Sequence, residues 1–317
     1  MQPTVERILR ARVYQLALET PLQEARRLSE RLGERVLVKR EDLQPIFSFK
    51  IRGACNKIAS LTREQAERGL VAASAGNHAQ GVALAAAHFG YRATIVMPRS
   101  TPRIKVEAVA ALGGEVVLHG DSFESALEEA RRREAESGGA FIHGYDDPEV
   151  IAGQGTIAVE IFRQHPDPID AIFVPVGGGG LLAGILAYVK FLHPSTAVIA
   201  VEPDDAASLE AALRAGRPVR LDNVGIFADG AAVAEVGSEV FRLVEGRLDG
   251  HVRVSGDELC AAIRDVFHDT RVVAEPAGAL AVAGMKKWIA EHPAAGARRT
   301  LVAVQSGANI NFHGLHQ

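Results

Sequence analysis

The chain has 317 residues, of which 47% are hydrophobic and 23% are charged, and its formal net charge is −4. This composition is typical of a globular protein of about two domains. The sequence has no basic block for nucleic acid or an anionic membrane surface, and its two cysteines form no C-x-x-C motif. Because it also has no signal peptide and no apolar run of membrane-spanning length, we expect a cytoplasmic protein.

Strand-like and helix-like patterns alternate from the first third of the chain onward. Thr20-Pro21 has the chemistry of a helix cap and first residue, and Gly33 predicts the end of that helix. A strand is expected at residues 36–38, and a helix from Lys50 to about Ser60.

The alternation continues through the middle of the chain, with strands expected at residues 70–73, 93–97 and 115–118. Helices are predicted from about Asn77 and after Thr101-Pro102. Asp121 and Glu124 have the spacing of a capping box, which indicates one more helix start.

The second half repeats this theme around a nearly all-apolar strand at residues 171–176, the pattern of a strand covered on both faces. Two further strands are expected at residues 197–201 and 300–304. Helices are predicted from about Gly180, near residues 257–268 and over residues 276–291. Alternating strands and helices predict parallel sheets wrapped by helices.

Lys50 lies inside the apolar run 47–51, which reads Phe-Ser-Phe-Lys-Ile. Removing an ammonium from water lowers its pKa, so that part of the lysine is a free amine able to form a Schiff base with a carbonyl carbon. The run alone is also compatible with a lysine whose stem packs while its head reaches water.

Four consecutive glycines, Gly177 to Gly180, stand between the buried strand and the next helix. Glycine lets a backbone approach an anion, and helix-start N–H groups point at it, so this segment predicts a phosphate cradle. The segment from Gly178 to Ala183 also fits the dinucleotide fingerprint G-x-G-x-x-A, with Glu202 about where a ribose-binding acid belongs. That alternative would make the protein an NAD-dependent oxidoreductase and would leave Lys50 without a role.

Two more loops follow predicted strands. The loop 74–81, Ser-Ala-Gly-Asn-His-Ala-Gln-Gly, offers backbone donors and the side chains of Ser74 and Asn77 to a small carboxylate. We expect His78 to be a histidine on the helix surface. Ser306 follows the last strand, at the kind of sheet edge where α/β proteins bind ligands. No H-E-x-x-H motif or Cys/His cluster indicates zinc.

Together these residues resemble the serine/threonine dehydratases that depend on pyridoxal 5′-phosphate. The likeness runs from about Val13 to Leu315 and is greatest to the biosynthetic threonine deaminases (threonine ammonia-lyases). The matching motifs are the cofactor-lysine segment 48–54, the substrate-carboxylate loop 74–81, the signature 150–156, the glycine run 177–180 and the pyridine-nitrogen loop 306–309. The segments that look most like the deaminases are 39–42, 47–50, 274–276 and 306–315.

The resemblance implies a fold-type II α/β architecture of two open, twisted, mostly parallel sheets wrapped by helices. It implies a small domain, residues 52–148, inserted into a large cofactor-binding domain, residues 1–51 and 149–317. We expect no C-terminal regulatory domain and therefore no inhibition by isoleucine. We also expect a homodimer or homotetramer, since such assemblies are common in the family.

The resemblance also implies site roles. Lys50 would hold the cofactor and then act as the base, Asn77 would bind the ring hydroxyl, and Ser306 would face the pyridine nitrogen. The remaining cofactor-binding residues would be Phe49, Gly177, Gly178, Gly179, Gly180 and Leu181. The substrate-binding residues would be Ser74, Ala75, Gly76, Asn77, His78, Gly153 and Gly230.

The implied reaction is β-elimination of L-threonine to 2-oxobutanoate and ammonia, as in isoleucine biosynthesis, and of L-serine to pyruvate. Gly144-Tyr145 departs from the family pattern, so another 3-hydroxy amino acid remains an alternative, as does a β-replacement enzyme. The resemblance places Ala75 where related serine racemases carry a serine that acts as an acid on the opposite face of the cofactor ring. Because alanine has no proton to give, we expect little or no racemisation. Glu202 resembles a cation ligand of relatives, but Ser208 replaces an aspartate there, so it is only a weak metal candidate.

Overall fold

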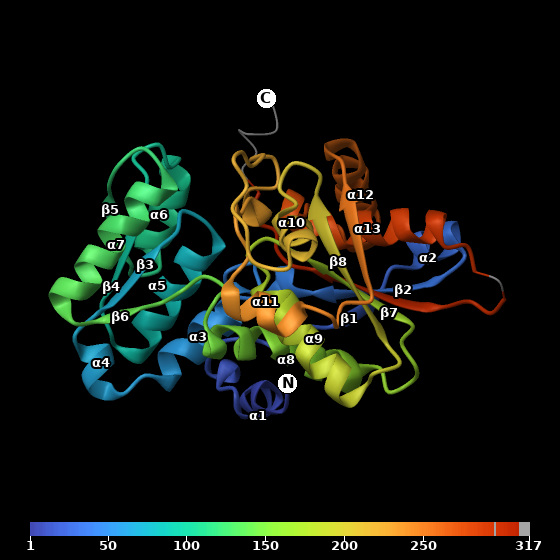
Figure 1. Ribbon diagram of the computed structural model, residues 1–317, viewed down its shortest axis with the longest axis horizontal. Helices are drawn as coiled ribbons and strands as arrows, with labels where there is room; N and C mark the ends of the chain where they lie inside the picture. The colour runs from blue at the N-terminus through green and yellow to red at the C-terminus, as the bar shows by residue number, and fades with distance from the viewer. Residues whose placement is uncertain (295, 311–317) are drawn as a thin grey trace.

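The computed structural model describes residues 1–294 and 296–310. It consists of two separate sheets that lie beside each other (Figure 1), each wrapped by helices. This confirms the expected α/β architecture with two mainly parallel sheets. The predicted likeness at residues 311–315 lies outside the described residues.

The larger sheet has six strands in the order β1-β2-β10-β7-β8-β9. All neighbours are parallel except β1, which runs antiparallel to β2 at one edge. The strands are β1 (Leu22–Glu24), β2 (Arg35–Arg40), β7 (Ala171–Pro175), β8 (Ala197–Pro203), β9 (Gly250–Val254) and β10 (Thr300–Gln305). The central strand β10 pairs Val302 with Leu37 on one side and with Ile172 on the other.

Helices cover both faces of this sheet, and alternate residues of β10 show it. Val302 and Val304 pack into one apolar cluster, while Leu301 and Ala303 pack into another on the opposite face. The first face carries α1 (Gln2–Arg10), α8 (Pro148–Gln164), α9 (Gly180–Leu192) and α11 (Ser238–Val244). The second face carries α2 (Arg26–Leu32), α12 (Gly256–Thr270) and α13 (Pro276–Glu291).

Three short 3₁₀ helices and one further α-helix belong to the connecting segments: η1 (Val13–Gln15), η2 (Glu41–Leu43), η3 (Asp229–Ala231) and α10 (Ser208–Ala215).

The smaller sheet has four parallel strands in the order β5-β4-β3-β6. They are β3 (Leu70–Ala73), β4 (Ala93–Met97), β5 (Glu115–Leu118) and β6 (Ala140–Phe141), and the helices in this part are α4 (Arg63–Glu67), α5 (Asn77–Phe89), α6 (Arg103–Ala111) and α7 (Phe123–Ser137). Its helix α5 contributes a run of buried alanines to the core on one face, and α7 contributes Ala126 and Ala130 on the other.

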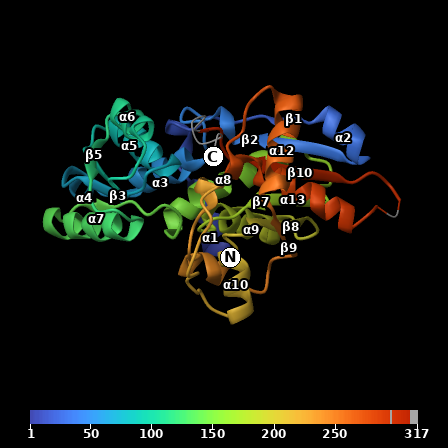
Figure 2. The same ribbon diagram turned by 90° about the horizontal axis from the view of Figure 1, so that it is seen from above.

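Helix α3 (Lys50–Ser60) joins the two parts, because it packs against both α8 and α5. Figure 2 shows α3 and α8 where the two sheets meet. The crossing of α3 with α8 is close: a Cβ built on Gly153 would lie 2.6 Å from the carbonyl oxygen of Arg52. Glycine at this position therefore lets the start of α3, with Lys50, pack closely against α8.

One predicted helix start and one predicted helix cap are wrong. Thr20-Pro21 does not open a helix: residues 22–24 form β1, because the free edge of β2 offers them a hydrogen-bonded partner, and α2 begins only at Arg26. The hydroxyl of Thr20 donates to Glu41 instead of capping a helix. Helix α7 is capped by Ser122, whose side chain accepts the N–H of Ser125 at 3.2 Å, and not by a box of Asp121 and Glu124.

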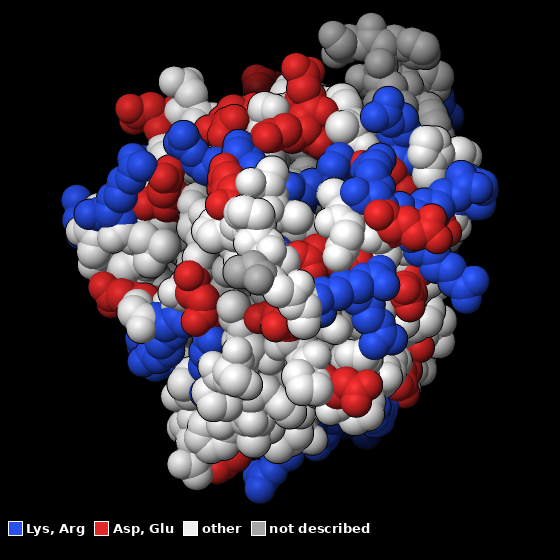
Figure 3. Space-filling model, turned by 90° about the vertical axis from the view of Figure 1, so that its right-hand side faces the viewer, with Lys and Arg blue, Asp and Glu red and all other residues white. Residues whose placement is uncertain are grey.

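The surface carries both signs of charge. Figure 3 shows lysine and arginine interspersed with aspartate and glutamate on one side of the molecule, with no broad field of a single sign. Among the described residues, no helix is long and apolar enough to cross a membrane.

Candidate active site

A cleft at the carboxyl end of β7 brings together most of the residues that the sequence singled out. Its lining comes from Phe49, Lys50, Gly144, Tyr145, Gln154, Pro175, Val176, Gly177, Gly178, Gly179, Gly180, Leu181, Gly230, Ala231, Val233, Ala277 and Ser306. Of the predicted cofactor-binding residues, only Asn77 is outside this lining. Of the predicted substrate-binding residues, only Gly230 is part of it.

Lys50 is the first residue of α3, and its ammonium donates a hydrogen bond to the carbonyl oxygen of Gly144 at 2.8 Å. Its Nζ lies 5.2 Å from the centre of the Phe49 ring. Burial lowers the pKa of Lys50 to about 8, against the opposing charge of Glu275. A fraction of this lysine is therefore an unprotonated amine near neutral pH.

The backbone before Lys50 is held in an uncommon conformation. Phe47 has φ 54°, in the left-handed region that residues with a side chain rarely adopt. The segment is fixed to the end of β10, because the N–H of Phe49 donates to the carbonyl of Ser306 and the N–H of Ala308 donates to that of Phe47. These two hydrogen bonds hold the segment before Lys50 against the segment that carries Ser306, although the two segments are far apart in the sequence.

The glycine run bends tightly between β7 and α9. Gly179 has φ +87°, and Gly180 begins the helix. A Cβ built on Gly178 would lie 2.3 Å from the ring of Tyr145, so a side chain there would displace the tyrosine that lies on the loop. Gly179 is therefore required by its backbone conformation, and Gly178 by the close approach of Tyr145.

The same run fits a phosphate group. Among the described residues, no hydrogen bond uses the backbone N–H of Gly178, Gly179, Gly180 or Leu181. These donors line the cleft at the N-terminal end of a 13-residue helix. Unpaired backbone donors at a helix start favour an anion with several oxygens.

The segment from His143 to Asp147 shapes the opposite wall of the cleft. The hydroxyl of Tyr145 donates to the carbonyl of Glu235 at 3.2 Å. The carboxylate of Asp146 accepts three backbone N–H groups at the start of α11, from Ser238 to Val240. These contacts give the departure at Gly144-Tyr145 a defined structure, in which Gly144 supplies the acceptor for Lys50.

The loop 74–81 connects β3 to α5, on the side of the smaller sheet. Ser74 Oγ accepts the N–H of Gly76 at 3.2 Å, and a Cβ on Gly76 would meet nothing within 4 Å. Among the described residues, the N–H groups of Ala75, Asn77 and His78 have no hydrogen-bond partner. The loop therefore has the free donors that a carboxylate would need.

The expectation of His78 on the helix surface is wrong, because its side chain is buried beneath the segment that carries Gly144. Its Nε2 lies 2.8 Å from the carbonyl oxygen of Ile142, an acceptor, which fixes the proton on this nitrogen. Burial and the nearby Lys50 lower the pKa of His78 to about 3. It is thus a neutral imidazole across the physiological range.

Gly153 does not line the cleft. It lies in the close crossing of α8 with α3, and its neighbour Gln154 lines the cleft instead and accepts the N–H of Gly53 at 3.2 Å. Helical spacing explains the difference, because residues adjacent in a helix point in different directions.

Ser306 follows β10 directly and is 4% exposed. Its hydroxyl donates to the carbonyl of Ala277 at 3.2 Å. A hydroxyl here offers a neutral group to a ring nitrogen, unlike a carboxylate, which would hold such a nitrogen protonated.

Two residues near the cleft were not predicted as site residues. Glu275 is 3% exposed and accepts the side-chain N–H of Asn77 at 2.7 Å. Burial, with Asp229 nearby, raises the pKa of Glu275 to about 7. Asn309 donates from its side chain to Asn77 at 2.7 Å. Both stand in motifs that carried the family resemblance, but helix-start and loop patterns alone gave neither a role.

A buried ion network lies on another side of α3. Arg52 donates to the carboxylates of Glu41, at 2.7 and 2.8 Å, and of Glu160, at 2.6 and 2.9 Å. Lys39 donates to Glu160 at 2.6 Å. None of these four side chains is exposed to solvent.

The weak metal candidate Glu202 is engaged within the protein. Its carboxylate accepts the N–H groups of Leu209 and Glu210 at the start of α10, and it lies 2.7 Å from the His251 ring. Ser208 is buried next to it, with a hydroxyl that has no partner among the described residues. Anywhere among the described residues, no group of three or more His, Cys, Asp or Glu side chains is placed to hold a metal ion.

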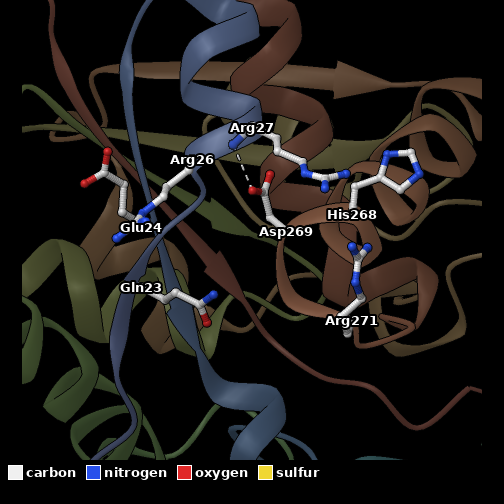
Figure 4. A pocket seen from close by; sticks show the side chains of 7 residues that line it. All are labelled: Gln23, Glu24, Arg26, Arg27, His268, Asp269 and Arg271. Carbon is white, nitrogen blue, oxygen red and sulfur yellow. Dashed lines mark hydrogen bonds between the residues drawn. The ribbon is translucent and has the colours of Figure 1, made fainter.

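A second cleft lies away from Lys50, where β1 and α2 meet the end of α12 (Figure 4). Its lining is polar and mostly basic: Gln23, Glu24, Arg26, Arg27, His268, Asp269 and Arg271. The Asp269 carboxylate already accepts the N–H groups of Arg27 and Leu28 and so caps α2. None of the predicted site residues lies there.

Comparisons with known proteins identify the family of this chain. A family model described as "Pyridoxal-phosphate dependent enzyme" matches residues 13–307. L-threonine dehydratase biosynthetic IlvA of Pasteurella multocida is 54% identical over 97% of this chain and 60% of its own length, and the protein of that name from Escherichia coli is 53% identical over 97% and 59%. The chain therefore spans about three fifths of these curated relatives.

Solved structures give the same result. The processed form of threonine deaminase isoform 2 from Solanum lycopersicum superposes with a TM-score of 0.96 at 47% identity, covering 99% of this chain and 91% of that one. Maize serine racemase superposes with a TM-score of 0.91 at 32% identity, covering 99% and 95%.

Proposed function

Because the chain belongs to the family of pyridoxal-phosphate dependent enzymes, we propose that it is a threonine ammonia-lyase. It would eliminate water from L-threonine to release an enamine, which tautomerises to an imine that water hydrolyses to 2-oxobutanoate and ammonia. It would convert L-serine to pyruvate and ammonia in the same way. The observation that carries the proposal is the presence, in one cleft, of a lysine with a lowered pKa and a glycine loop with unpaired N–H groups. The names of relatives more than 50% identical support the substrate and the biosynthetic role.

The cofactor would supply an electron sink for cleavage of bonds at the substrate Cα. Lys50 would hold its aldehyde carbon through Nζ, which a lowered pKa makes nucleophilic. Once displaced by the substrate amine, the same Nζ would take the proton from Cα. Gly144, which accepts a hydrogen bond from Nζ, would orient the lysine.

The remaining cleft residues support binding roles. The N–H groups from Gly178 to Leu181 would hold the cofactor phosphate, and Phe49 would lie beside Lys50. Ser306 would face the ring nitrogen as a neutral partner. Because a neutral partner does not hold that nitrogen protonated, loss of the β-substituent is favoured over transamination.

The loop 74–78 would bind the substrate carboxylate. Its free N–H groups at Ala75, Asn77 and His78 support this role, and the neutral His78 ring would place no second charge beside Lys50. Gly153 is better explained by helix packing, so we propose Gln154 in its place as the residue of α8 that faces the substrate.

We further propose that residues 52–148 form the small domain and residues 1–51 and 149–317 the large one. The four-stranded sheet, built within residues 70–141, supports this division. A cytoplasmic location and a homodimeric or homotetrameric state remain predictions.

The nicotinamide-dependent alternative is wrong, since the chain belongs to a different cofactor family. The structure also leaves no ribose-binding role for Glu202, whose carboxylate is occupied by α10 and His251. Activity on another 3-hydroxy amino acid, or β-replacement, would be distinguished by substrate comparison and by dependence of the rate on an added nucleophile such as sulfide.

The test is a visible spectrum of the purified protein with pyridoxal 5′-phosphate, followed by addition of L-threonine and measurement of 2-oxobutanoate in the same cuvette. We expect a visible band that changes on addition, with release of product. In Lys50→Ala both the band and turnover should be lost, the latter by more than about 10³-fold. Lys287→Ala, which removes a lysine on α13 paired with Glu258, is the matched control and should behave like the parent protein.

A band without turnover of L-threonine would contradict the proposed substrate. A band of normal intensity in Lys50→Ala would contradict the assignment of the cofactor lysine.

A further inference from the structure

Three side chains from distant parts of the chain form a continuous hydrogen-bonded chain beside the cleft. Asn77 begins α5, Glu275 precedes α13, and Asn309 lies beyond β10. The side-chain nitrogen of Asn309 lies 2.7 Å from Oδ1 of Asn77, and Nδ2 of Asn77 lies 2.7 Å from Oε1 of Glu275. Asn77 is therefore held from both ends of its amide.

The orientation of each amide follows from a count of donors. Asn309 Nδ2 also donates to the backbone carbonyl of Ile46 at 2.8 Å, and a carbonyl can only accept. The two N–H bonds of Asn309 are thus both used, one on Ile46 and one on Asn77. Asn77 must consequently present its oxygen to Asn309 and its nitrogen to Glu275.

This count leaves one N–H of Asn77 unused. An amide nitrogen has two hydrogens, and among the described residues only Glu275 accepts one of them. Gly230, which lines the cleft, lies close to this nitrogen, because a Cβ built on Gly230 would be 4.0 Å from Nδ2 of Asn77. The spare donor is thus next to the cleft.

The surrounding backbone leaves space for the Glu275 carboxylate. A Cβ on Gly307 would lie 2.3 Å from Oε1 of Glu275, and a Cβ on Gly230 would lie 3.7 Å from the same atom. The backbone N–H of Glu275 donates to the carbonyl of Gly307. The Glu275 carboxylate therefore lies between two glycines whose lack of a side chain leaves room for it. This arrangement supports a role for the buried carboxylate itself, which is not that of an exposed helix cap.

We propose that Glu275 and Asn309 are positioning residues that force Asn77 to act as a hydrogen-bond donor toward an anionic oxygen on the cofactor ring. The inference rests on the proposed function, because it requires a cofactor with such an oxygen in the cleft. A fixed donor stabilises the ionised form of its partner, and a preset orientation avoids the cost of turning the amide on binding. Glu275 and Asn309 act only through Asn77.

The experiment is a double-substitution cycle on the whole protein, measured without substrate. The dissociation constant of pyridoxal 5′-phosphate and the visible spectrum, which reports ionisation of the ring hydroxyl, are determined for four proteins: the parent, Asn77→Ala, Glu275→Leu and the double variant. We expect each single substitution to raise the dissociation constant about tenfold and to shift the spectrum in the same direction. In the double variant the second substitution should add less than about twofold.

Glu275→Gln is the matched control, because its amide oxygen can still accept from Asn77 without a charge. It should bind the cofactor within about twofold of the parent. Asn309→Ala is a second route to the same result that leaves the buried acid in place, and it should resemble Glu275→Leu.

Additive effects in the double variant would overturn the proposal, since they would mean that Glu275 acts independently of Asn77. Equal weakening in Glu275→Gln and Glu275→Leu would also overturn it. Cofactor binding is measured separately from turnover, so a parent protein that binds the cofactor but leaves L-threonine unchanged would reject the proposed substrate while the cycle still decides the role of Glu275. A parent protein that binds no cofactor would reject both.

Discussion

Lys39 is fully buried and Lys50 lies half-buried in the cleft, and their partners differ. Lys39 belongs to the ion network beneath α3, where its ammonium donates to the Glu160 carboxylate and to the carbonyl of Thr20. Lys50 donates only to the carbonyl of Gly144 among the described residues. Burial lowers the pKa of both lysines, but the Glu160 carboxylate opposes this shift at Lys39, whereas Lys50 has a hydrogen bond and no ion pair.

Two buried glutamates repeat this contrast. Burial by itself would raise the pKa of Glu160, but the hydrogen bonds and positive charges of Arg52 and Lys39 outweigh burial. The pKa of Glu160 is therefore lowered. Glu275 has amide partners and a nearby aspartate, and its pKa rises to about 7. Burial alone therefore does not make a residue reactive; a buried charge without a paired opposite charge is what distinguishes the cleft from the network.

The largest expected effect is on the network side. Arg52→Met would leave the buried carboxylates of Glu41 and Glu160 with Lys39 as their remaining cation. We expect the free energy of unfolding to fall by about 3–5 kcal/mol, because uncompensated buried charge is strongly unfavourable. Urea denaturation of the parent protein and of Arg52→Met measures this difference in the free energy of unfolding.

Arg63→Met is the control for that experiment, since the Arg63 side chain is 85% exposed and its pair with Glu67 lies on the surface of α4. It should change stability by less than about 0.5 kcal/mol. Equal losses in the two variants would contradict the distinction between buried and exposed pairs.

The second effect concerns Glu275 in the cofactor-free protein. Its pKa is about 7 in the folded chain, above the ordinary value of 4.5. The folded state therefore binds a proton more tightly than the unfolded state, so stability falls as pH rises from 4.5 to 7, and the cost is complete above pH 7. Lys50, Asp229 and Lys105 are the charged groups that act on this acid.

Glu275→Gln should thus raise the free energy of unfolding by about 2 kcal/mol at pH 8 and by almost nothing at pH 4.5. Denaturation at both pH values checks this. A gain that is equal at the two values would show that the charge of Glu275 is not the cause.

A smaller effect on stability, opposite in sign to that of Arg52→Met, is expected for the substitution Lys50→Met. The pKa of Lys50 is about 8 in the folded protein and 10.5 when unperturbed, so the cost of the buried ammonium is complete below pH 8 and disappears as pH rises to 10.5. Lys50→Met should stabilise the cofactor-free protein by about 1–2 kcal/mol at pH 7 and by nearly zero at pH 10.5. A loss of stability at pH 7 would place Lys50 with the structural lysines.

The smallest effect is a reaction that should hardly occur. Ala75 has no proton to give, and the hydroxyls of Tyr145 and Ser306 already donate to backbone carbonyls. With L-serine as substrate, D-serine should form at least about 100-fold more slowly than pyruvate. Chiral chromatography of the reaction mixture measures both, and D-serine at a comparable rate would mean that another group in the cleft delivers a proton to Cα.

The sequence predicted the fold class because its signals are local. The apolar strand at residues 171–176 and the glycines after it needed only period and composition to indicate a buried strand followed by a helix. Lys50 stood out for the same reason, as a charge inside an apolar run. The family motifs then indicated which loops belong to one site.

Local patterns failed where a distant segment competed for the same groups. Thr20-Pro21 has the chemistry of a helix start, but the free edge of β2 takes residues 22–24 into a strand. His78 has the position of a surface residue at a helix start, but the segment with Gly144 covers it. In both cases the partner lies far away in the chain, where propensity carries no information.

The sequence by itself therefore determined the alternation of strands and helices, the lysine inside an apolar run and the glycine loop, because each depends on neighbours within a few residues. Only the tertiary structure decided that Lys50, unlike Lys39, has no carboxylate partner among the described residues, that Gln154 and not Gly153 faces the cleft, and that Glu275 and Asn309 hold Asn77. Those properties depend on pairings between segments separated by up to 232 residues, and a hydrogen bond or an ion pair is set by the distance between two groups in space, not by their separation along the chain.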